Sequence, residues 1–158
     1  MTDQTRREFC AQACQLASAA AVGTLLQACG GGGGSITGGS LPSNVPALST
    51  LSATSASGGV TLNIDAGSPL AAVGGAAIVQ SPSGLILVAH TAADTFTAVT
   101  ATCTHENCTI TGFTGQDFVC PCHGSRFSTS GVVQNGPATR PLRSFATRFA
   151  GNVLTISI

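Results

Sequence analysis

Two short stretches near the middle of the chain carry most of its reactive side chains. They read Cys103-Thr104-His105-Glu106-Asn107-Cys108 and Cys120-Pro121-Cys122-His123-Gly124-Ser125. Together they hold four of the seven cysteines and two of the three histidines. The spacings Cys-x-His and Cys-x-x-His each place one soft sulfur and one imidazole nitrogen where both reach a metal from the same loop. The two stretches therefore predict a metal site built from two loops.

Three kinds of site use this set of residues. A structural zinc ion takes two thiolates and two imidazoles. Two structural disulfides would suit an exported protein, but they leave the histidines unexplained. A Rieske [2Fe-2S] cluster takes two thiolates on one iron and two imidazoles on the other. In the zinc and cluster alternatives the same four residues are the ligands, namely Cys103, His105, Cys120 and His123, and Cys108 and Cys122 remain over.

The sequence on both sides of these loops predicts short β-strands. Alternating or β-branched runs of about four to six residues are bounded by Gly, Pro, Asn or Ser. They fall at residues 60–64, 76–79, 85–90, 96–99, 118–120, 132–134, 145–149 and 153–158. Residues 81–84 and 150–152 have the composition of hairpin turns. Because no segment past residue 60 keeps a helical period, we expect an all-β antiparallel sandwich or barrel.

The composition excludes several classes of function. The 158 residues contain 6 Lys and Arg against 6 Asp and Glu, and none of the six cations is Lys. Binding of nucleic acid phosphates needs a clustered excess of cations, so we expect no nucleic acid partner. The length permits one domain with a short appendage. Because no charged residue lies between Phe9 and Ile64, the chain divides into two unlike pieces.

Residues 1–28 resemble a bacterial export signal. Arg6, Arg7 and Phe9 stand in the places of the twin-arginine pattern, ahead of an Ala-rich apolar run. Leu26-Gln27-Ala28-Cys29 resembles a lipoprotein cleavage box, which implies that Cys29 becomes the lipid-bearing first residue. The alternative is an uncleaved membrane anchor over residues 9–29, which are uncharged.

The stretch after Cys29 predicts a spacer. Residues 29–59 are rich in Gly, Ser, Thr and Pro and offer little to pack, which is typical of a flexible linker. The folded domain is therefore expected over residues 60–158, with the metal-binding loops at about residues 100–128.

The two loops closely resemble the cluster-binding loops of Rieske [2Fe-2S] proteins, specifically the high-potential kind found in cytochrome bc complexes and related periplasmic subunits. The resemblance covers about residues 98–142. It implies a Rieske-type β-sandwich or barrel with a small cluster-binding subdomain. It also implies that Cys103 and Cys120 bind the buried iron and that His105 and His123 bind the outer iron.

The same resemblance assigns roles to residues around the ligands. Cys108 and Cys122 resemble the family's disulfide, which ties one loop to the other and favours an oxidising compartment. Ser125 matches a serine whose hydroxyl donates to a bridging sulfide, and Pro137 lies in a segment that resembles the proline loop over the cluster. Phe127 stands where high-potential members carry a Tyr whose hydroxyl bonds a ligand sulfur. We therefore expect a reduction potential below that of respiratory bc-type proteins but above that of oxygenase ferredoxins.

The resemblance implies an exported, lipid-anchored, one-electron carrier on the periplasmic side of a bacterial membrane, which makes and breaks no substrate bond itself. Its partner would be a cytochrome, a quinol-oxidising complex or a molybdoenzyme. One alternative is the iron-sulfur subunit of a bc-type quinol-oxidising complex or of an arsenite-oxidase-like molybdoenzyme. Another is a zinc-bound structural module. Glu106 and Asn107 would be awkward in an apolar quinol pocket, and they favour a soluble partner.

Four further residues have ordinary interpretations. His90 ends a strand-like run and is expected at a surface or as a satisfied edge histidine. Arg140, Arg143 and Arg148 cluster late in the chain, where they are either scattered surface charge or a contact for an acidic partner.

Overall fold

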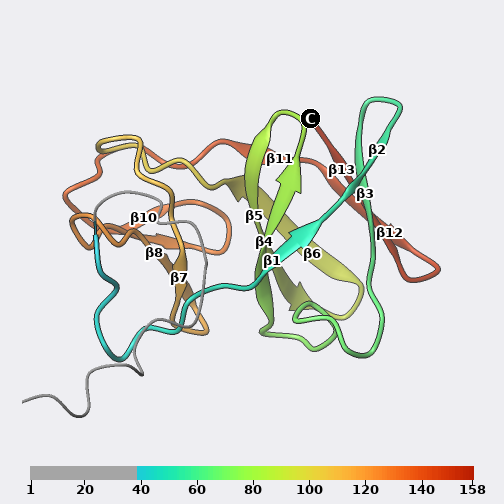
Figure 1. The fold of residues 1–158 in the computed structure, drawn as a ribbon, viewed down its shortest axis with the longest axis horizontal. Helices are drawn as coiled ribbons and strands as arrows, with labels where there is room; N and C mark the ends of the chain where they lie inside the picture. Colours follow the sequence, from blue (N-terminus) through green and yellow to red (C-terminus); the bar gives the residue numbers. More distant parts are fainter. Residues whose placement is uncertain (1–38) are drawn as a thin grey trace, which may run out of the picture. The chain divides into compact units, whose positions relative to one another are not determined.

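The computed structural model describes residues 39–158, which form short strands and turns and contain no helix (Figure 1). The predicted all-β class is confirmed. Within these residues no helix has the length and hydropathy to cross a membrane. The strands are β1 (Thr50–Ser52), β2 (Thr54–Ala56), β3 (Gly59–Asn63), β4 (Ala76–Ser81), β5 (Gly84–Ala92), β6 (Thr95–Thr100), β7 (Gly112–Phe113), β8 (Asp117–Val119), β9 (Arg126–Ser128), β10 (Val133–Asn135), β11 (Ser144–Phe145), β12 (Thr147–Ala150) and β13 (Val153–Ser157).

The strands form three sheets. A five-stranded sheet has the order β1-β4-β5-β6-β11, and a four-stranded sheet of order β12-β13-β3-β2 packs on one of its faces. The third sheet, of order β10-β9-β8-β7, lies against the other face and carries the metal-binding loops (Figure 1). The fold is thus a β-sandwich with a smaller subdomain attached, as the resemblance implies.

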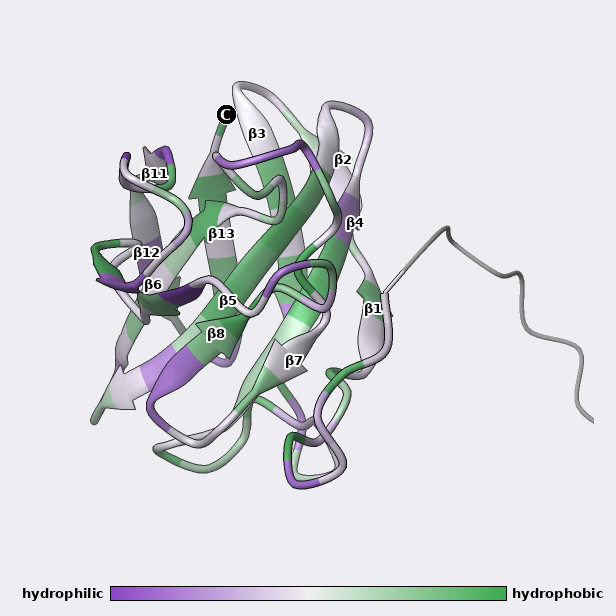
Figure 2. Cartoon of the chain, turned by 90° about the vertical axis from the view of Figure 1, so that its left-hand side faces the viewer, coloured by the Kyte–Doolittle hydropathy of each residue, from purple (hydrophilic) through white to green (hydrophobic). Residues whose placement is uncertain are grey.

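The central strand β5 is buried on both faces because its side chains enter two different cores. Leu87 and Ala89 point into the core shared with the small sheet, which we call the cluster-side core. Ile86 and Val88 point into the core shared with β3 and β13, which we call the base core. A strand covered on both sides needs a continuous apolar run, and Leu85-Ile86-Leu87-Val88-Ala89 supplies it. Figure 2 shows β5 mostly in the green of apolar residues.

The predicted strand positions agree with the observed ones wherever the runs are long and apolar. Both predicted turns are confirmed, since Ser81 pairs with Gly84 and Ala150 pairs with Val153 across the two hairpins. The single strand predicted at residues 145–149 is wrong, because β11 pairs with β6 whereas β12 pairs with β13. The chain changes sheets at Ala146, and no local pattern marks such a change.

The folded part begins before residue 60, where the sequence predicts a spacer. Strand β1 adds a parallel edge strand beside β4, and β2 pairs with β3. Val45 is buried, and the Leu48 N–H donates to the Thr111 carbonyl at 2.7 Å. These contacts use backbone groups and small side chains, which composition does not distinguish from a linker. Residues 1–38, with the predicted export signal and Cys29, lie outside the described residues.

The start of this segment lies directly against the second metal-binding loop. A Cβ atom at Gly39 would be 2.5 Å from the Pro121 carbonyl oxygen and 2.7 Å from Cys122 Cα, so only glycine fits there. Further along, Ala47 forms a β-bridge with Gly112 of β7. The segment from Gly39 to Leu48 therefore packs against the small subdomain as part of the fold.

Candidate metal centre

The first metal-binding loop, residues 103–108, connects β6 to β7 and is closed by its own backbone. The Cys103 N–H donates to the Cys108 carbonyl at 2.8 Å, and the Asn107 N–H donates back to the Cys103 carbonyl at 3.0 Å. Asn107 takes a left-handed conformation with φ of 56°. Asn is among the residues that tolerate this region, because its short polar side chain makes local hydrogen bonds. A β-bridge between Thr102 and Thr109 closes the base of the loop.

The second loop, residues 120–125, connects β8 to β9 and repeats this closure. The Cys120 N–H donates to the Ser125 carbonyl at 2.9 Å, and the Gly124 N–H donates to the Cys120 carbonyl at 3.1 Å. Gly124, four residues after the cysteine as Asn107 is, has φ of 72°. Both loops thus use the same backbone turn to present a cysteine at the start and a histidine within the turn.

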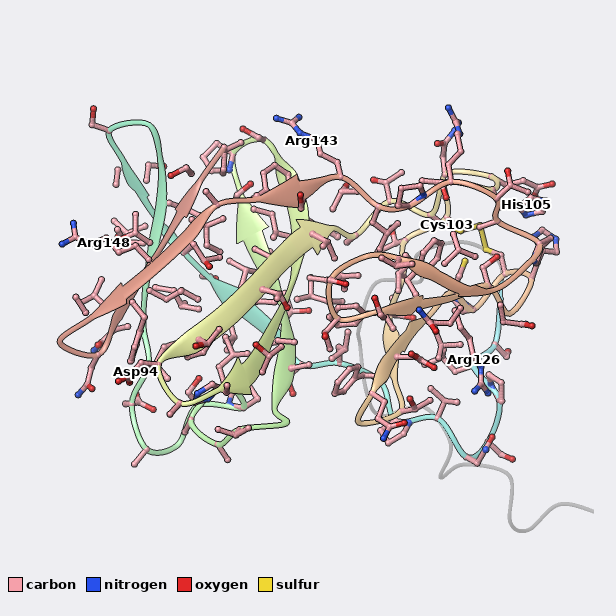
Figure 3. All side chains as sticks on the ribbon, turned by 180° about the vertical axis from the view of Figure 1, so that it is seen from behind. Asp94, Cys103, His105, Arg126, Arg143 and Arg148 are labelled. Atoms are coloured by element: carbon pink, nitrogen blue, oxygen red, sulfur yellow. A yellow bond between two sulfur atoms is a disulfide. The ribbon has the colours of Figure 1, made fainter. Side chains whose placement is uncertain are left out.

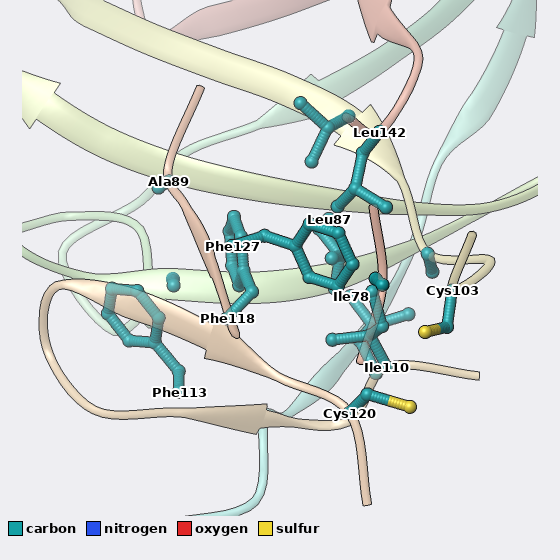
Figure 4. Close-up of a cluster of buried hydrophobic side chains, with 14 residues drawn as sticks. Ile78, Leu87, Ala89, Cys103, Ile110, Phe113, Phe118, Cys120, Phe127 and Leu142 are labelled. Atoms are coloured by element: carbon teal, nitrogen blue, oxygen red, sulfur yellow. The ribbon is translucent and has the colours of Figure 1, made fainter. Parts of the chain in front are cut away.

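The two cysteines that open the loops are free and buried. Cys103 is 1% exposed and Cys120 is 2% exposed, and both belong to the cluster-side core. Figure 4 shows both sulfur atoms at the same end of this core, close to Ile110. Burial raises the pKa of the Cys120 thiol, and its hydrogen bond with Cys103 acts in the same direction. The backbone N–H groups of Cys122 and His123 act in the opposite direction and lower the Cys120 pKa, each by less than burial raises it.

The two histidines lie at the exposed end of the same loops. The His105 and His123 rings have centroids 5.0 Å apart and are nearly perpendicular, at 89°. Both side chains are exposed, and Figure 3 shows His105 at the outer tip with Cys103 deeper in the fold. Glu106 Oε2 lies 3.6 Å from His123 Nδ1. The site is therefore two-ended, with buried sulfur on one side and accessible imidazole on the other.

The remaining two loop cysteines form a disulfide. Cys108 and Cys122 are bonded to each other, which joins the first loop to the second. This confirms the predicted pairing. The Cys120 sulfur lies within 4.8 Å of the two bonded sulfurs, but a bonded sulfur has no thiolate to offer a metal. Only Cys103 and Cys120 remain as sulfur ligands in the described part of the chain.

The donor arrangement fits a two-iron cluster better than a single zinc ion. Tetrahedral zinc with bonds of about 2.0–2.3 Å draws four ligand atoms around one point. In residues 39–158, no set of three or more ligand atoms within 4.8 Å of one another combines a free thiol with an imidazole. The close set on the imidazole side is instead His105, Glu106 and His123. Two separate donor pairs are what a cluster with sulfur on one iron and imidazole on the other requires.

A third segment of chain is tied to both loops. Ser125 is fully buried, and its Oγ accepts a hydrogen bond from the Ala138 N–H at 3.0 Å. The Ser125 hydroxyl hydrogen stays available for the donor role that the resemblance implies. The Thr104 hydroxyl donates to the Arg140 carbonyl at 2.6 Å. Pro137 follows a cis peptide bond and is itself exposed, so Ala138 is the member of this segment that packs into the core.

Comparison with known protein families identifies the domain. The family model described as Rieske [2Fe-2S] domain matches residues 63–146, which is more than half of the chain. The chain belongs to the Rieske family. Rieske domains carry a [2Fe-2S] cluster, so this is the cofactor of the domain, and its work is electron transfer.

Related Rieske proteins resemble this chain over part of its length. It is 36% identical over 62 residues to a cytochrome b6-f complex iron-sulfur subunit of Chlorobaculum thiosulfatiphilum, which is 39% of this chain and 34% of the relative. It is 43% identical over 56 residues to a similar subunit of Nostoc sp. PCC 7120, covering 35% of this chain and 32% of the relative. The chain thus spans about a third of the length of these relatives.

A solved Rieske structure shares the fold. The plasma membrane Rieske protein of the cyanobacterium Synechocystis PCC 6803 superposes with a TM-score of 0.53 and is 33% identical in sequence. The superposition covers 61% of this chain and 99% of that one. The likeness shows that the described domain shares its fold with a Rieske protein.

Two residues have roles that sequence reasoning did not assign. Asn107 supplies the left-handed position of the first loop, and aligning the two loops by their first cysteines would have matched it to Gly124. The sequence predicts His90 at a surface or as a satisfied edge histidine, and this prediction is wrong. His90 is buried in the central strand β5, stacks on Phe96 with ring centroids 4.2 Å apart and has Nδ1 2.9 Å from the Leu70 carbonyl oxygen, while its Nε2 has no hydrogen-bond partner among the described residues. It lies in the sandwich and is no part of the metal centre.

Proposed function

We propose that Cys103 and Cys120 hold the buried iron of the cluster, that His105 and His123 hold the outer iron, and that the chain works as a one-electron carrier. The supporting observation is the two-ended donor set, with two free buried thiols at one end and two exposed imidazoles 5.0 Å apart at the other. Both pairs are presented by the same backbone turn.

Three properties of the site suit the chain to electron transfer. Two neutral imidazoles in place of two thiolates make the centre less negative, which raises the reduction potential. The backbone N–H groups that donate to the Cys120 sulfur stabilise negative charge there, so they favour the reduced state. The His105 and His123 side chains are exposed, so a redox partner can approach the imidazole end of the site directly.

The same proposal includes location. An exported protein that relays electrons on the periplasmic side of a membrane is supported by the Cys108–Cys122 disulfide, because stable disulfides form in oxidising compartments. The twin-arginine-like start and Cys29 provide separate support from the sequence. An intact mass measurement of the mature N-terminus tests this part: acylation at Cys29 is expected, and an unprocessed N-terminus would contradict it.

One alternative keeps the cluster but changes the partner. The relatives from Chlorobaculum and Nostoc are subunits of cytochrome b6-f complexes, which favours a place in a quinol-oxidising complex. Against it, the exposed Glu106 carboxylate lies beside His123, and burying this charge in an apolar pocket is costly. Purification from native membranes separates the two: a complex subunit elutes with a cytochrome partner at fixed stoichiometry, whereas a carrier elutes alone.

The cluster assignment is tested by spectroscopy on the purified full chain. We expect a reddish-brown protein with two irons and two acid-labile sulfides, which bleaches with dithionite and then gives a paramagnetic signal. The His105→Cys variant should retain a cluster of lower potential, because a thiolate replaces a neutral ligand. A colourless protein that binds one zinc ion would refute the proposal.

A further inference from the structure

A groove of about 300 Å³ runs along the first metal-binding loop. It lies between this loop and the segment 140–143, and we call it the arginine groove. Its polar lining consists of Thr100, Thr102, Thr104, Asn107, Arg140 and Arg143. Cys103 lines it as well, so the contents of the groove adjoin a proposed cluster ligand.

The positive charge in the arginine groove is uncompensated. No carboxylate lines the groove, and in the described part of the chain neither Arg140 nor Arg143 forms an ion pair. The one ion pair found in those residues joins Glu106 to His123 at the tip. Two arginines line one concave space that contains no carboxylate, and their positive charge favours an anion there.

Contacts beside the groove hold the segment 140–143 in place. The Arg143 guanidinium carbon lies 5.0 Å from the centroid of the Phe145 ring, which borders the segment but does not line the groove. The Thr100 N–H donates to the Arg143 carbonyl at 2.9 Å, and the Thr104 hydroxyl fixes the Arg140 carbonyl. The main chain at both arginines is thus attached to the strand and loop that lead to Cys103, so binding would require ordering of the side chains but not of the backbone.

Neutral donors complete the lining. The Thr100 Oγ accepts a hydrogen bond from the Thr102 N–H at 3.3 Å, so its hydroxyl hydrogen stays free to donate. The Thr102 hydroxyl and the Asn107 amide have no hydrogen-bond partner of their own among the described residues and border the same space. Arginine side chains flanked by hydroxyl and amide donors match the acceptor oxygens of a phosphate, sulfate or carboxylate group.

We propose that the arginine groove is an oxyanion-binding site whose occupancy is coupled to the redox state of the cluster. Reduction adds one negative charge to the centre next to Cys103, so a bound anion is held more weakly in the reduced protein. By linkage, the anion lowers the reduction potential to the same extent. The redox part rests on the proposed function, whereas the binding part rests only on the groove.

Calorimetric titration of the full oxidised chain with inorganic sulfate tests the binding part. Sulfate is a suitable probe because it stays doubly charged around neutral pH, and chloride keeps the ionic strength constant. We expect Arg140→Gln and Arg143→Gln each to weaken binding about fivefold, as for the loss of one charge-assisted contact at an exposed site. Arg148→Gln is the matched control, because it removes the same charge from β12 outside the groove. Equal binding of sulfate by all four proteins, or no binding of either sulfate or a hexaglutamate peptide, overturns the site.

The source of the oxyanion is distinguished by a second probe, a hexaglutamate peptide that presents carboxylates as a partner protein would. Binding of sulfate with the arginine dependence above assigns the groove to a free anion. Binding of the peptide alone, with the same dependence, assigns it to carboxylates displayed on another chain.

A redox titration with and without sulfate tests the coupling. A threefold preference for the oxidised protein would lower the potential by about 28 mV at saturating sulfate, at 59 mV per tenfold change for one electron. In Arg140→Gln about fivefold more sulfate should be needed to reach the same shift, whereas Arg148→Gln should respond at the same sulfate concentration as the wild type. Equal sulfate affinity of the oxidised and reduced proteins overturns the coupling. A chain that binds sulfate but assembles no cluster would refute the proposed function and leave the binding site standing.

Discussion

The two metal-binding loops share one backbone turn but differ in how much of the domain covers them. In the first loop His105, Glu106 and Asn107 are all exposed, whereas in the second only His123 is. The second loop is held by Gly39 on one side and by the Ser125–Ala138 hydrogen bond on another. The backbone frame therefore comes from local hydrogen bonds and one left-handed residue, and the surrounding chain then makes the second loop the more rigid support.

Replacement of the first cysteine of each loop tests whether the two loops contribute equally to binding of the cluster. Cys103→Ser and Cys120→Ser should each abolish the cluster, because each removes one of the two thiolates on the buried iron. Optical absorbance and sulfide content measure the loss. Full cluster content in either variant would show that the loops are unequal and that the ligand assignment is wrong.

Removal of the disulfide tests how much the link between the two loops stabilises the domain. The bridge closes a loop with a sequence separation of 14, so Cys108→Ser with Cys122→Ser should lower the free energy of unfolding by about 3 kcal/mol. Denaturant unfolding of the variant and of the wild type measures this. The reduced wild type is the control and should behave as the variant does, and an unchanged unfolding midpoint in both would contradict the expectation.

The links to segment 138–140 sharpen the contrast between the loops. Ser125→Ala should destabilise the protein by about 1–3 kcal/mol, because the buried Ala138 N–H loses its acceptor. Thr104→Val removes the corresponding link of the first loop, where water can replace the hydroxyl, and should cost about 0.5–1 kcal/mol. Thermal unfolding midpoints compare the two variants. If the midpoints fall by the same amount, the second loop is not the more firmly held of the two.

The left-handed residues separate backbone strain from packing. Gly124→Ala should cost about 1–2 kcal/mol through its positive φ alone, since an added Cβ there would meet nothing within 4 Å. Asn107→Ala should cost less, because Asn already bears a side chain in that conformation, and Asn107→Gly should be neutral or stabilising. Unfolding midpoints of the three variants test this order, which would be refuted by a costly Asn107→Gly.

The substitution Phe127→Tyr, which adds a hydroxyl just beyond the second loop, should raise the reduction potential of the cluster. Phe127 is fully buried in the core that contains Cys103 and Cys120. A Tyr hydroxyl bonded to a ligand sulfur, if worth about 1 kcal/mol more in the reduced state, raises the potential by about 40 mV. Phe113→Tyr, beyond the first loop in the same core, is the control and should leave the potential unchanged. Redox titration that gives the same value for Phe127→Tyr and wild type would show that the hydroxyl does not reach a sulfur.

The residues around the loops could be predicted because their information is local. Four cysteines and two histidines at fixed spacings predicted two loops, and the pairing of Cys108 with Cys122 followed from a resemblance that the structure confirms. Strands such as β5 were visible because a strand buried on both faces needs a long apolar run. That Cys103, His105, Cys120 and His123 bind the cluster stays a prediction.

What the sequence could not predict depends on contacts between distant residues. Strand β1 is exposed and only three residues long, and it is recognised by its parallel partner β4, which begins 26 residues later. Strands β7 and β9 have two and three residues, too few for alternation to stand out. The arginine groove forms because segment 140–143 returns to the first loop through one hydroxyl, that of Thr104.

The position of β1 has a practical consequence for anyone who shortens this chain. The family match begins at residue 63, so a truncation guided by it would delete β1, β2 and all of β3 except Asn63. Strand β4, with Ile78 and Val79, would then become an exposed edge strand with a row of unsatisfied amide and carbonyl groups. Such edges recruit strands from neighbouring molecules, so the shortened protein should self-associate even though every proposed ligand is present.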